Sequence, residues 1–261
     1  MRAYKQLLKT VLRNGQSRVS RNGIVKSYFG WKGVYDLMPF PLLTLRKIYW
    51  KGVVGELLSF FRAYKNVNDF KKLGVNFWDP WAEPETGDLG RIYGVQWRDF
   101  KGVDQFDLID KEFKRNPYSR RLVVSAWNPA ELDKMALPPC HVLFQFYVSE
   151  PFISCLLYQR SADVVIGVPY NIASYALLTY IFAKKWQLVP KELIHVIGDA
   201  HIYEDHLDVA KTLLKTKSLP RPKLTIRDCV KNKPFEKIVP DDIILRDYRY
   251  QLDLKGLKVH V

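Results

Sequence analysis

Cys140 has the setting of a nucleophile. It lies in Leu137-Pro-Pro-Cys-His141, where two prolines stiffen the approach to a strand-like run and a histidine follows directly. A thiol attacks as the thiolate, and a nearby arginine or protonated histidine lowers its pKa. A buried structural cysteine is the commoner fate of a free thiol, so the local pattern alone leaves both readings open. Cys155 and Cys229 lack this setting, and we expect both to be structural.

The segment from Gln159 to Tyr175 combines the end of a strand-like run with the start of an apolar helix. Arg160 and Ser161 could hold a phosphate, because a guanidinium fork and a hydroxyl both donate hydrogen bonds. Asn171 carries both an acceptor and a donor, so its amide can read the edge of a pyrimidine. The alternative makes Asn171 a helix N-cap and Arg160 a surface charge, and the residues themselves do not decide between the two.

Weaker candidates lie elsewhere in the chain. Glu56 is the only acid in the mostly apolar stretch 53–61, and a carboxylate on a core-facing helix is either paired or functional. His201 and Tyr203 could hydrogen-bond a sugar hydroxyl, although a lone histidine is more often a satisfied structural group. Trp78 and Trp81 could form a stacking platform for a ligand or could simply be core aromatics. Arg120 and Arg121 could bind a phosphate or could be solvated surface charges.

Hydrophobic periodicity predicts the elements that position these residues. Helical spacing predicts helices over 4–13, 44–64, 104–115, 170–186 and 203–214. Runs rich in β-branched and aromatic residues predict a strand or hairpin over 24–37. They also predict strands over 121–127, 141–148, 152–158, 193–197, 223–227 and 242–246, with a turn joining 141–148 to 152–158. We expect an α+β fold in one domain over 1–261, with one large sheet and helices against one face. A second subunit could cover the other face.

Composition bounds the class of protein. The chain has 261 residues, of which 48% are hydrophobic, so there is ample material for a packed core. Three cysteines without a CxxC pair argue against a disulfide framework or a zinc site, and free thiols suit a reducing cytoplasm. We recognise no signal peptide and no run near the roughly 18 apolar residues of a membrane span. The net charge of +14 indicates an anionic partner: nucleic acid, a membrane surface or a phosphorylated small molecule.

Taken together, the motifs resemble the thymidylate synthase family over nearly the whole chain. The run from Arg121 through Lys134-Met-Ala-Leu-Pro-Pro-Cys-His141 to Phe146 resembles the active-site signature of that family. Segments 159–163 and 167–175 resemble its nucleotide-binding part, and 198–203 its sugar-binding part. Segments 77–81 and 93–97 also match in order and spacing. Several such pieces in register make a chance match implausible.

The resemblance implies a reaction. Cys140 would add to C6 of dUMP, which makes C5 a carbon nucleophile that attacks the methylene of 5,10-methylenetetrahydrofolate. A hydride from the same folate would then give dTMP and dihydrofolate, without a metal. Glu56 would organise the waters and proton movements, and Tyr93 would position the water that removes the C5 proton. His141 and Asp163 are also expected among the catalytic residues, with Asp163 contacting the pterin.

The resemblance also implies binding roles and an obligate homodimer. Asn171 would read the uracil edge, and His201 and Tyr203 would bind the 3′-hydroxyl. Arg120 and Arg121 would reach the phosphate in the site of the other subunit. The full set of implied dUMP-binding residues is Arg21, Arg120, Arg121, Gln159, Arg160, Ser161, Asn171, His201 and Tyr203. The implied folate-binding residues are Trp78, Trp81, Asp163, Gly167, Tyr170 and Val261.

The chain departs from the pattern of the family after Glu56, where Ser59 and Arg62-Ala-Tyr-Lys65 stand in place of a tryptophan and a glycine-containing turn, and in two further segments. The segment Ser20-Arg-Asn-Gly-Ile-Val-Lys26 has less Gly and Thr than the phosphate loop of the family, and the tail Lys258-Val-His-Val261 has an atypical histidine before its terminal valine. That tail normally closes over the folate and excludes water. The alternative is therefore a phage-type dUMP hydroxymethyltransferase, working in the host cytoplasm, which adds water where the synthase adds hydride. RNA binding remains open only as a secondary property, because it leaves Cys140 unexplained.

Overall fold

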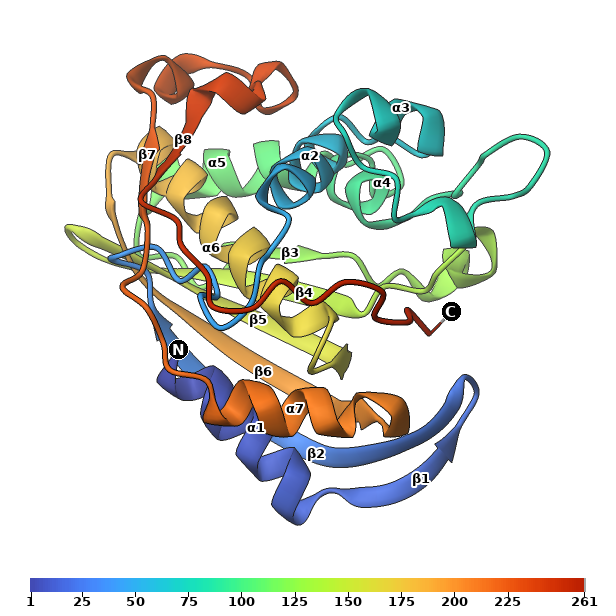
Figure 1. The fold of residues 1–261 in the computed structure, drawn as a ribbon. Coiled ribbons are helices and arrows are strands. Elements are labelled where there is room, and N and C mark those ends of the chain that lie inside the picture. Colours follow the sequence, from blue (N-terminus) through green and yellow to red (C-terminus); the bar gives the residue numbers. More distant parts are fainter. Residues whose placement is uncertain (261) are drawn as a thin grey trace.

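The chain is organised around one mixed sheet, as a computed structural model that describes residues 1–260 shows (Figure 1). The six strands are ordered β1-β2-β6-β5-β4-β3, and every neighbouring pair is antiparallel except β5 and β6, which are parallel. The bounds are β1 (Gln16–Ser20), β2 (Gly23–Asp36), β3 (Val123–Ser125), β4 (His141–Ser149), β5 (Phe152–Asp163) and β6 (Val189–Tyr203). A separate antiparallel pair joins β7 (Lys223–Ile226) to β8 (Ile243–Arg246).

The helices form a layer on this sheet. Their bounds are α1 (Arg2–Asn14), α2 (Trp50–Phe61), α3 (Val67–Lys72), α4 (Tyr93–Arg98), α5 (Gln105–Arg115), α6 (Gly167–Trp186) and α7 (Leu207–Lys215). Helix α6 lies across β5 and β6 and is covered in turn by α2, with α4 packed against α2. Helices α1 and α7 lie side by side next to β2 and β6. Within residues 1–260, no helix has the length and apolar character needed to cross a lipid bilayer.

Helix α6 is the centre of the core. Most of its side chains are buried, as the predominantly apolar sequence predicted. The helix ends where Gln187 adopts a left-handed conformation with φ of 58°, and Lys184 and Lys185 in its last turn complement the helix dipole. Since α6 begins at Gly167, directly after β5, its first turns stand beside the ends of the central strands.

Only one face of the central strands is fully covered by helices. In β5, Cys155 and Leu157 are completely buried, whereas Leu156 and Tyr158 between and after them are half-buried. Successive side chains point to opposite faces of a sheet, so the alternation separates a helix-covered face from a more open apolar one. The predicted α+β fold is confirmed, and pairing of two copies through the open face stays a prediction. Cys155 is structural, and burial raises its pKa to about 12.

Several predicted boundaries are wrong, for a common reason. The helix predicted over 44–64 begins only at Trp50, because the preceding segment is held extended: Arg46 forms a bridge with Leu252 and its Nη2 donates to the carbonyl of Val165 at 2.9 Å. The strand predicted over 193–197 is the middle of the long β6, and α7 starts after a 3-10 turn, Glu204–His206. Contacts with distant segments set these ends. Elements β1, α3 and α4 were not predicted.

Candidate active site

Cys140 lies just before β4 in a loop that Arg160 holds in place. The Nε and Nη2 atoms of Arg160 donate to the carbonyls of Pro139 and Pro138 at 2.9 and 2.8 Å. The backbone N–H of Arg160 donates to the carbonyl of Cys140 at 2.9 Å. Its Nη2 is also 3.8 Å from Cys140 Sγ. Arg160 is therefore neither a free surface charge nor remote from the nucleophile: it fixes the loop and places a positive charge beside the sulfur.

The charge state of this thiol differs from the one we expected. Burial raises the pKa of Cys140, and the charge of Arg160 and a hydrogen bond with Tyr93 oppose that rise only in part. Burial also lowers the pKa of His141 to about 4, so its ring is neutral at pH 7. The expectation that a protonated histidine lowers the thiol pKa is wrong for His141. Arg160 is the cation at the sulfur, and desolvation outweighs it.

Tyr93, the first residue of α4, contacts Cys140 directly. Its Oη accepts a hydrogen bond from the backbone N–H of Cys140 at 2.8 Å. Its ring stacks on Phe60 with centroids 5.3 Å apart and meets Trp78 edge-on at 6.0 Å. Burial raises the pKa of Tyr93 well above its usual value, so the hydroxyl keeps its proton. Tyr93 thus joins α4 to the Cys140 loop and presents a neutral hydroxyl to the site.

Glu56 faces the same aromatic group from α2. The indole Nε1 of Trp78 donates to Glu56 Oε1 at 2.8 Å, and Trp81 packs against Trp78 with ring centroids 5.7 Å apart. Burial raises the pKa of Glu56 to about 7, although the bond from Trp78 opposes the rise. A carboxyl group with a pKa near 7 can both accept and release a proton at neutral pH. The carboxylate is therefore paired with Trp78, and its role in the reaction stays a prediction.

Asn171 is held in one orientation by its neighbours. Gln159, which is buried on β5, donates from Nε2 to Asn171 Oδ1 at 3.0 Å, and the Gln159 Oε1 atom is 2.8 Å from Nε2 of His195. The Asn171 amide also favours the protonated ring of His141, against the larger opposing effect of burial on the pKa of that ring. The N-cap of α6 is Ile166, so the alternative that made Asn171 a helix cap is wrong. Its NH₂ end remains the part best suited to donate to a bound base.

His201 and Tyr203 lie at the end of β6, beside the end of β5. His201 pairs in register with Asp163, and its Nδ1 is 3.3 Å from Asp199 Oδ1. The Asp163 Oδ1 atom accepts from the two backbone N–H groups that follow, Val165 at 2.8 Å and Ile166 at 3.0 Å. Part of this carboxylate therefore stabilises the turn that leads into α6, next to Ser161 on the same strand.

The remaining predicted residues are placed less centrally. Arg21 is exposed in the turn between β1 and β2, and its Nε donates to Asn22 Oδ1 at 2.9 Å. Arg120 and Arg121 are exposed in the approach to β3, at the far edge of the sheet from β1. Gly167 and Tyr170 are in the first turn of α6, where Tyr170 Oη accepts from the N–H of Tyr49 at 3.3 Å. Val261 lies outside the described residues.

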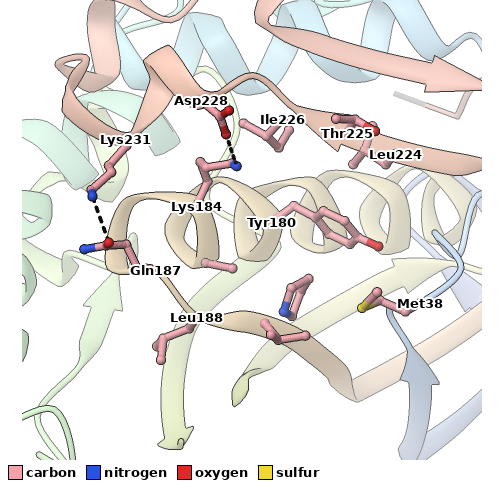
Figure 2. A pocket seen from close by; sticks show the side chains of 13 residues that line it. Met38, Tyr180, Lys184, Gln187, Leu188, Leu224, Thr225, Ile226, Asp228 and Lys231 are labelled. Atoms are coloured by element: carbon pink, nitrogen blue, oxygen red, sulfur yellow. Dashed lines mark hydrogen bonds and ion pairs between the residues drawn. The ribbon is translucent and has the colours of Figure 1, made fainter. Parts of the chain in front are cut away.

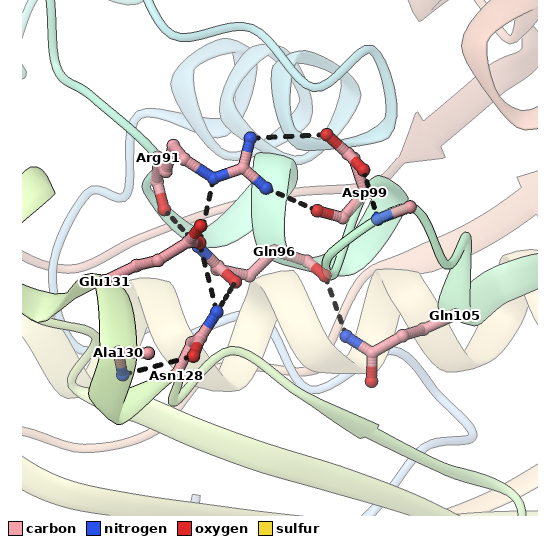
Figure 3. A network of polar contacts seen from close by, with 8 residues as sticks. Arg91, Gln96, Asp99, Gln105, Asn128, Ala130 and Glu131 are labelled. Atoms are coloured by element: carbon pink, nitrogen blue, oxygen red, sulfur yellow. Dashed lines mark hydrogen bonds and ion pairs between the residues drawn. The ribbon is translucent and has the colours of Figure 1, made fainter.

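Sequence reasoning missed the polar network that supports α4 (Figure 3). Arg91 Nε, Gln96 Nε2 and Asn128 Nδ2 all lie within 3.0 Å of Glu131 Oε2. The hydrogen bonds from Gln96 and then Arg91 keep the pKa of Glu131 below its usual value. The 3-10 turn Pro129–Lys134 carries Glu131 and leads to Cys140, so the network ties Tyr93 and Cys140 to one support. Glu131 and Asp133 are separated by one residue in the sequence, and nothing in that stretch indicated that Glu131 has partners in α4 and just before it.

A hollow at the opposite end of α6 contains none of the predicted site residues (Figure 2). Its polar groups are paired with one another: Lys184 Nζ with Asp228 Oδ1 at 2.7 Å, and Lys231 Nζ with Gln187 Oε1 at 2.8 Å. A helix of this length is about 30 Å long at 1.5 Å per residue, so this hollow is remote from Cys140. Perturbed pKa values occur here too, since burial raises the pKa of Tyr180 to about 12. At the Cys140 loop, by contrast, the groups with shifted pKa values, Cys140, Tyr93 and His141, are in direct contact with one another.

Comparison with known proteins agrees with this clustering. A family model described as thymidylate synthase matches residues 2–259. This chain belongs to the thymidylate synthase family. The thymidylate synthase of Mycoplasma pneumoniae (strain ATCC 29342 / M129 / Subtype 1) is 40% identical to it over 286 aligned positions, which cover 98% of this chain and 99% of that protein. The resemblance drawn from the motifs is confirmed, and the chain is an enzyme of the thymidylate synthase family, with dUMP as nucleotide and methylenetetrahydrofolate as co-substrate.

Proposed function

We propose that this enzyme makes dTMP and dihydrofolate from dUMP and 5,10-methylenetetrahydrofolate through a covalent bond between Cys140 Sγ and C6 of the uracil ring. The observation that carries the proposal is the position of Arg160, whose Nη2 is 3.8 Å from Cys140 Sγ while its other contacts hold the loop. Because a thiolate is the nucleophile, a cation fixed beside a buried sulfur favours the reactive form at the moment of attack.

The first step uses Cys140 and Asn171. The thiolate adds to C6, and the electron pair of the C5–C6 double bond moves toward O4, so that C5 becomes nucleophilic. The NH₂ group of Asn171 donates to O4 as negative charge grows there, and Gln159 keeps the amide from rotating because it donates to Asn171 Oδ1 at 3.0 Å. Preorganised donors of this kind lower the barrier because they need no reorientation.

The later steps need proton movements that suit Glu56. C5 attacks the methylene carbon of the folate, whose carbon–nitrogen bond breaks, and the C5 proton then leaves through a water positioned by Tyr93. Breakage of the remaining carbon–nitrogen bond between the methylene and the folate releases tetrahydrofolate and leaves an exocyclic methylene on the ring, with Cys140 Sγ still bonded to C6. A hydride from that tetrahydrofolate then reduces the methylene to the methyl group of dTMP as the C6–Sγ bond breaks, which gives dihydrofolate and frees the thiolate. A carboxyl group with a pKa of about 7 can relay protons in both directions during this sequence.

Binding of the two substrates follows the placement of the polar residues. We assign the phosphate to Arg21, Arg160 and Ser161, the 3′-hydroxyl to His201 and Tyr203, and the pterin to Asp163 beside Trp78 and Trp81. Since Arg120 and Arg121 are exposed at the other edge of the sheet, their proposed role at the phosphate is in the site of a second copy. We therefore propose a homodimer that pairs through the open sheet face.

The last step separates the synthase from the hydroxymethyltransferase alternative. Trp78 is only 5% exposed and packs against Tyr93, Phe60 and Trp81. This apolar wall beside Glu56 supports exclusion of water from the methylene intermediate, and hence completion by hydride.

Mass analysis of both products tests the proposal. Incubation with dUMP and methylenetetrahydrofolate should give dTMP with dihydrofolate; hydroxymethyl-dUMP with tetrahydrofolate would support the alternative instead. Without folate, the C5 hydrogen of dUMP should exchange with deuterium from solvent, because the C6 adduct activates C5. Cys140→Ser should lose both reactions. Full activity in Cys140→Ser would overturn the covalent mechanism.

A further inference from the structure

His260, near the C-terminus, is inserted beside the residues assigned to the nucleotide. Its ring stacks on Tyr203 with centroids 3.7 Å apart and planes 8° from parallel. Its Nδ1 is 3.1 Å from the carbonyl oxygen of Asn22, and its Nε2 is 3.0 Å from each carboxylate oxygen of Asp205. The side chain is 8% exposed. We call this group the His260 latch: His260, Asn22, Tyr203 and Asp205.

The latch joins segments that are far apart in the chain. Asn22 is in the β1–β2 turn next to Arg21, Tyr203 ends β6, and Asp205 is in the following 3-10 turn. The tail is fastened again upstream, where Asp253 pairs with Lys47 at 3.2 Å. The C-terminal segment therefore runs from the approach to α2 to the nucleotide side, between α6 and α7 (Figure 1). His260 thus joins the turn that carries the proposed phosphate ligand Arg21, through Asn22, to the proposed sugar ligand Tyr203.

The partners of His260 determine its protonation in the latch. A backbone carbonyl and a carboxylate only accept hydrogen bonds, whereas a neutral imidazole has one N–H donor. Both contacts can therefore be hydrogen bonds only when both ring nitrogens carry hydrogen, which is the imidazolium form. The pairing with Asp205 is then a charge-assisted bond, which is stronger than a neutral one.

The charged and titratable groups around the latch come from three elements. Asp205 and His206 face it from the 3-10 turn, with the His206 ring 5.6 Å from that of His260 at an angle of 80°. Tyr203 faces it from β6, and burial raises the pKa of that phenol, which is therefore neutral. Arg21 lies in the β1–β2 turn, and its charge acts on Tyr203. Among these groups, Asp205 is the anion that stabilises an imidazolium.

We propose that His260 is a positioning residue for nucleotide binding: as the imidazolium, it ties the C-terminal tail to the Arg21 turn and to Tyr203, and so holds the phosphate and sugar sides of the site in place. The proposal rests on the proposed function, since the nucleotide is the ligand whose binding it assists. Loss of a proton from His260 breaks one of its two hydrogen bonds and releases the turn. Nucleotide binding should therefore depend on His260 more strongly at acidic than at alkaline pH.

The test compares the Kd for dUMP, without folate, in wild type and His260→Ala at pH 5.5 and pH 9. Because the phosphate of dUMP also titrates, with a second pKa of about 6, the ratio of the two Kd values is the quantity to read. We expect His260→Ala to bind about tenfold more weakly at pH 5.5, which is the effect of losing one charge-assisted bond of about 1.4 kcal/mol. At pH 9 the ratio should fall to about twofold. A ratio that does not change with pH would overturn the proposal.

Two further variants separate charge from folding. His260→Arg keeps a planar cation that stacks on an aromatic ring and donates to both acceptors at every pH used, so it should bind dUMP more tightly than wild type at pH 9. Asp205→Asn should reproduce the pH 5.5 loss. Lys258→Ala, which removes an exposed positive charge two residues earlier, is the matched control and should bind like wild type. Equal weakening in Lys258→Ala would contradict a role for His260 itself.

A bound metal is the competing explanation, since ligand atoms of Asp205, His206 and His260 lie within 4.8 Å of one another. Dialysis of wild type against EDTA should leave the Kd for dUMP unchanged. If dialysis weakened binding as much as His260→Ala does, and Zn²⁺ alone restored it, the role proposed for the His260 latch would be overturned. Deuterium exchange at C5 with saturating dUMP separates this inference from the proposed function. Exchange should persist in His260→Ala, whereas its absence from wild type would refute the Cys140 mechanism and leave the Kd comparison valid.

Discussion

Trp78 donates a hydrogen bond from its indole Nε1 to Glu56 Oε1 across 2.8 Å, and the two residues come from different segments of the chain. The bond favours the ionised carboxylate, while burial favours the protonated acid and prevails, which puts the pKa of Glu56 at about 7. The pair therefore places a carboxyl group that can bind and release a proton beside aromatic side chains. Its titration lies in the physiological range because burial outweighs the hydrogen bond and moves the pKa to about 7.

Replacing Glu56 should change stability in a pH-dependent way. Between about pH 4.5 and 7 the folded state holds the Glu56 proton and the unfolded chain does not, so the free energy of unfolding falls as pH rises through this window. Glu56→Gln stays neutral and keeps an oxygen for Trp78. We expect it to raise the free energy of unfolding by about 1–3 kcal/mol at pH 8 and to change it little at pH 4.5. Urea unfolding at both pH values measures this, and an equal effect at both would contradict it.

Arg160 should control the reactivity of the Cys140 thiol. Arg160→Lys keeps a positive charge but loses the planar fork that donates to Pro138 and Pro139. We expect the thiol to require a higher pH for alkylation by iodoacetamide, with the midpoint of the rate–pH profile shifted upward by about one unit. Arg115→Lys, on the exposed face of α5, is the control. A midpoint that stays in place would show that Arg160 does not act on the sulfur.

Removal of the Tyr93 hydroxyl should affect both stability and rate. Tyr93→Phe leaves the backbone N–H of Cys140 without its acceptor at 2.8 Å, and an unsatisfied N–H of this kind costs about 1–3 kcal/mol. We expect the free energy of unfolding to fall by that amount and kcat to fall by at least tenfold, with little change in the Kd for dUMP. Thermal and urea unfolding with steady-state kinetics test this; wild-type kcat in a stably folded variant would exclude a role in the reaction.

Asn171 should determine the choice between uracil and cytosine. Asn171→Asp replaces the donor that faces O4 of uracil with an acceptor, while cytosine offers an amino group at the same position. We expect the Kd for dUMP to rise by about a hundredfold and the preference over dCMP to be lost or reversed. Isothermal titration with both nucleotides measures the preference. Retained selectivity for dUMP in the aspartate variant would refute the base-reading role.

Mixing two inactive variants tests whether Arg120 and Arg121 act across a dimer. Cys140→Ser lacks the nucleophile, and a double variant, Arg120→Ala with Arg121→Ala, lacks the proposed phosphate ligands. If each site takes its arginines from the other copy, co-refolded mixtures should contain one site with both defects and one site with neither. Activity should then reappear at about a quarter of the wild-type value, the expected share of intact sites in a random mixture of dimers. No recovery in mixed dimers would place the arginines in their own subunit.

The sequence by itself determined the motifs and most of the regular elements. The apolar run of α6, the strand-like runs around Cys140 and the polar segment after β5 follow from local periodicity, which depends only on residues near one another in the chain. The fold class and the candidate nucleophile could therefore be predicted. The start of the helix predicted from residue 44 could not be predicted correctly, because Arg46 is held by Leu252 and Val165, both distant in sequence.

Only the tertiary structure decided how the site residues act on one another. The residue types suggested that His141 would supply positive charge to the thiol, yet burial keeps its ring neutral and leaves Arg160 beside the sulfur. The stacking of His260 on Tyr203 had no signal in the local pattern. Desolvation depends on all the atoms packed around a group, and a contact between residues distant in sequence depends on how the whole chain folds. Neither is encoded in a short stretch of sequence.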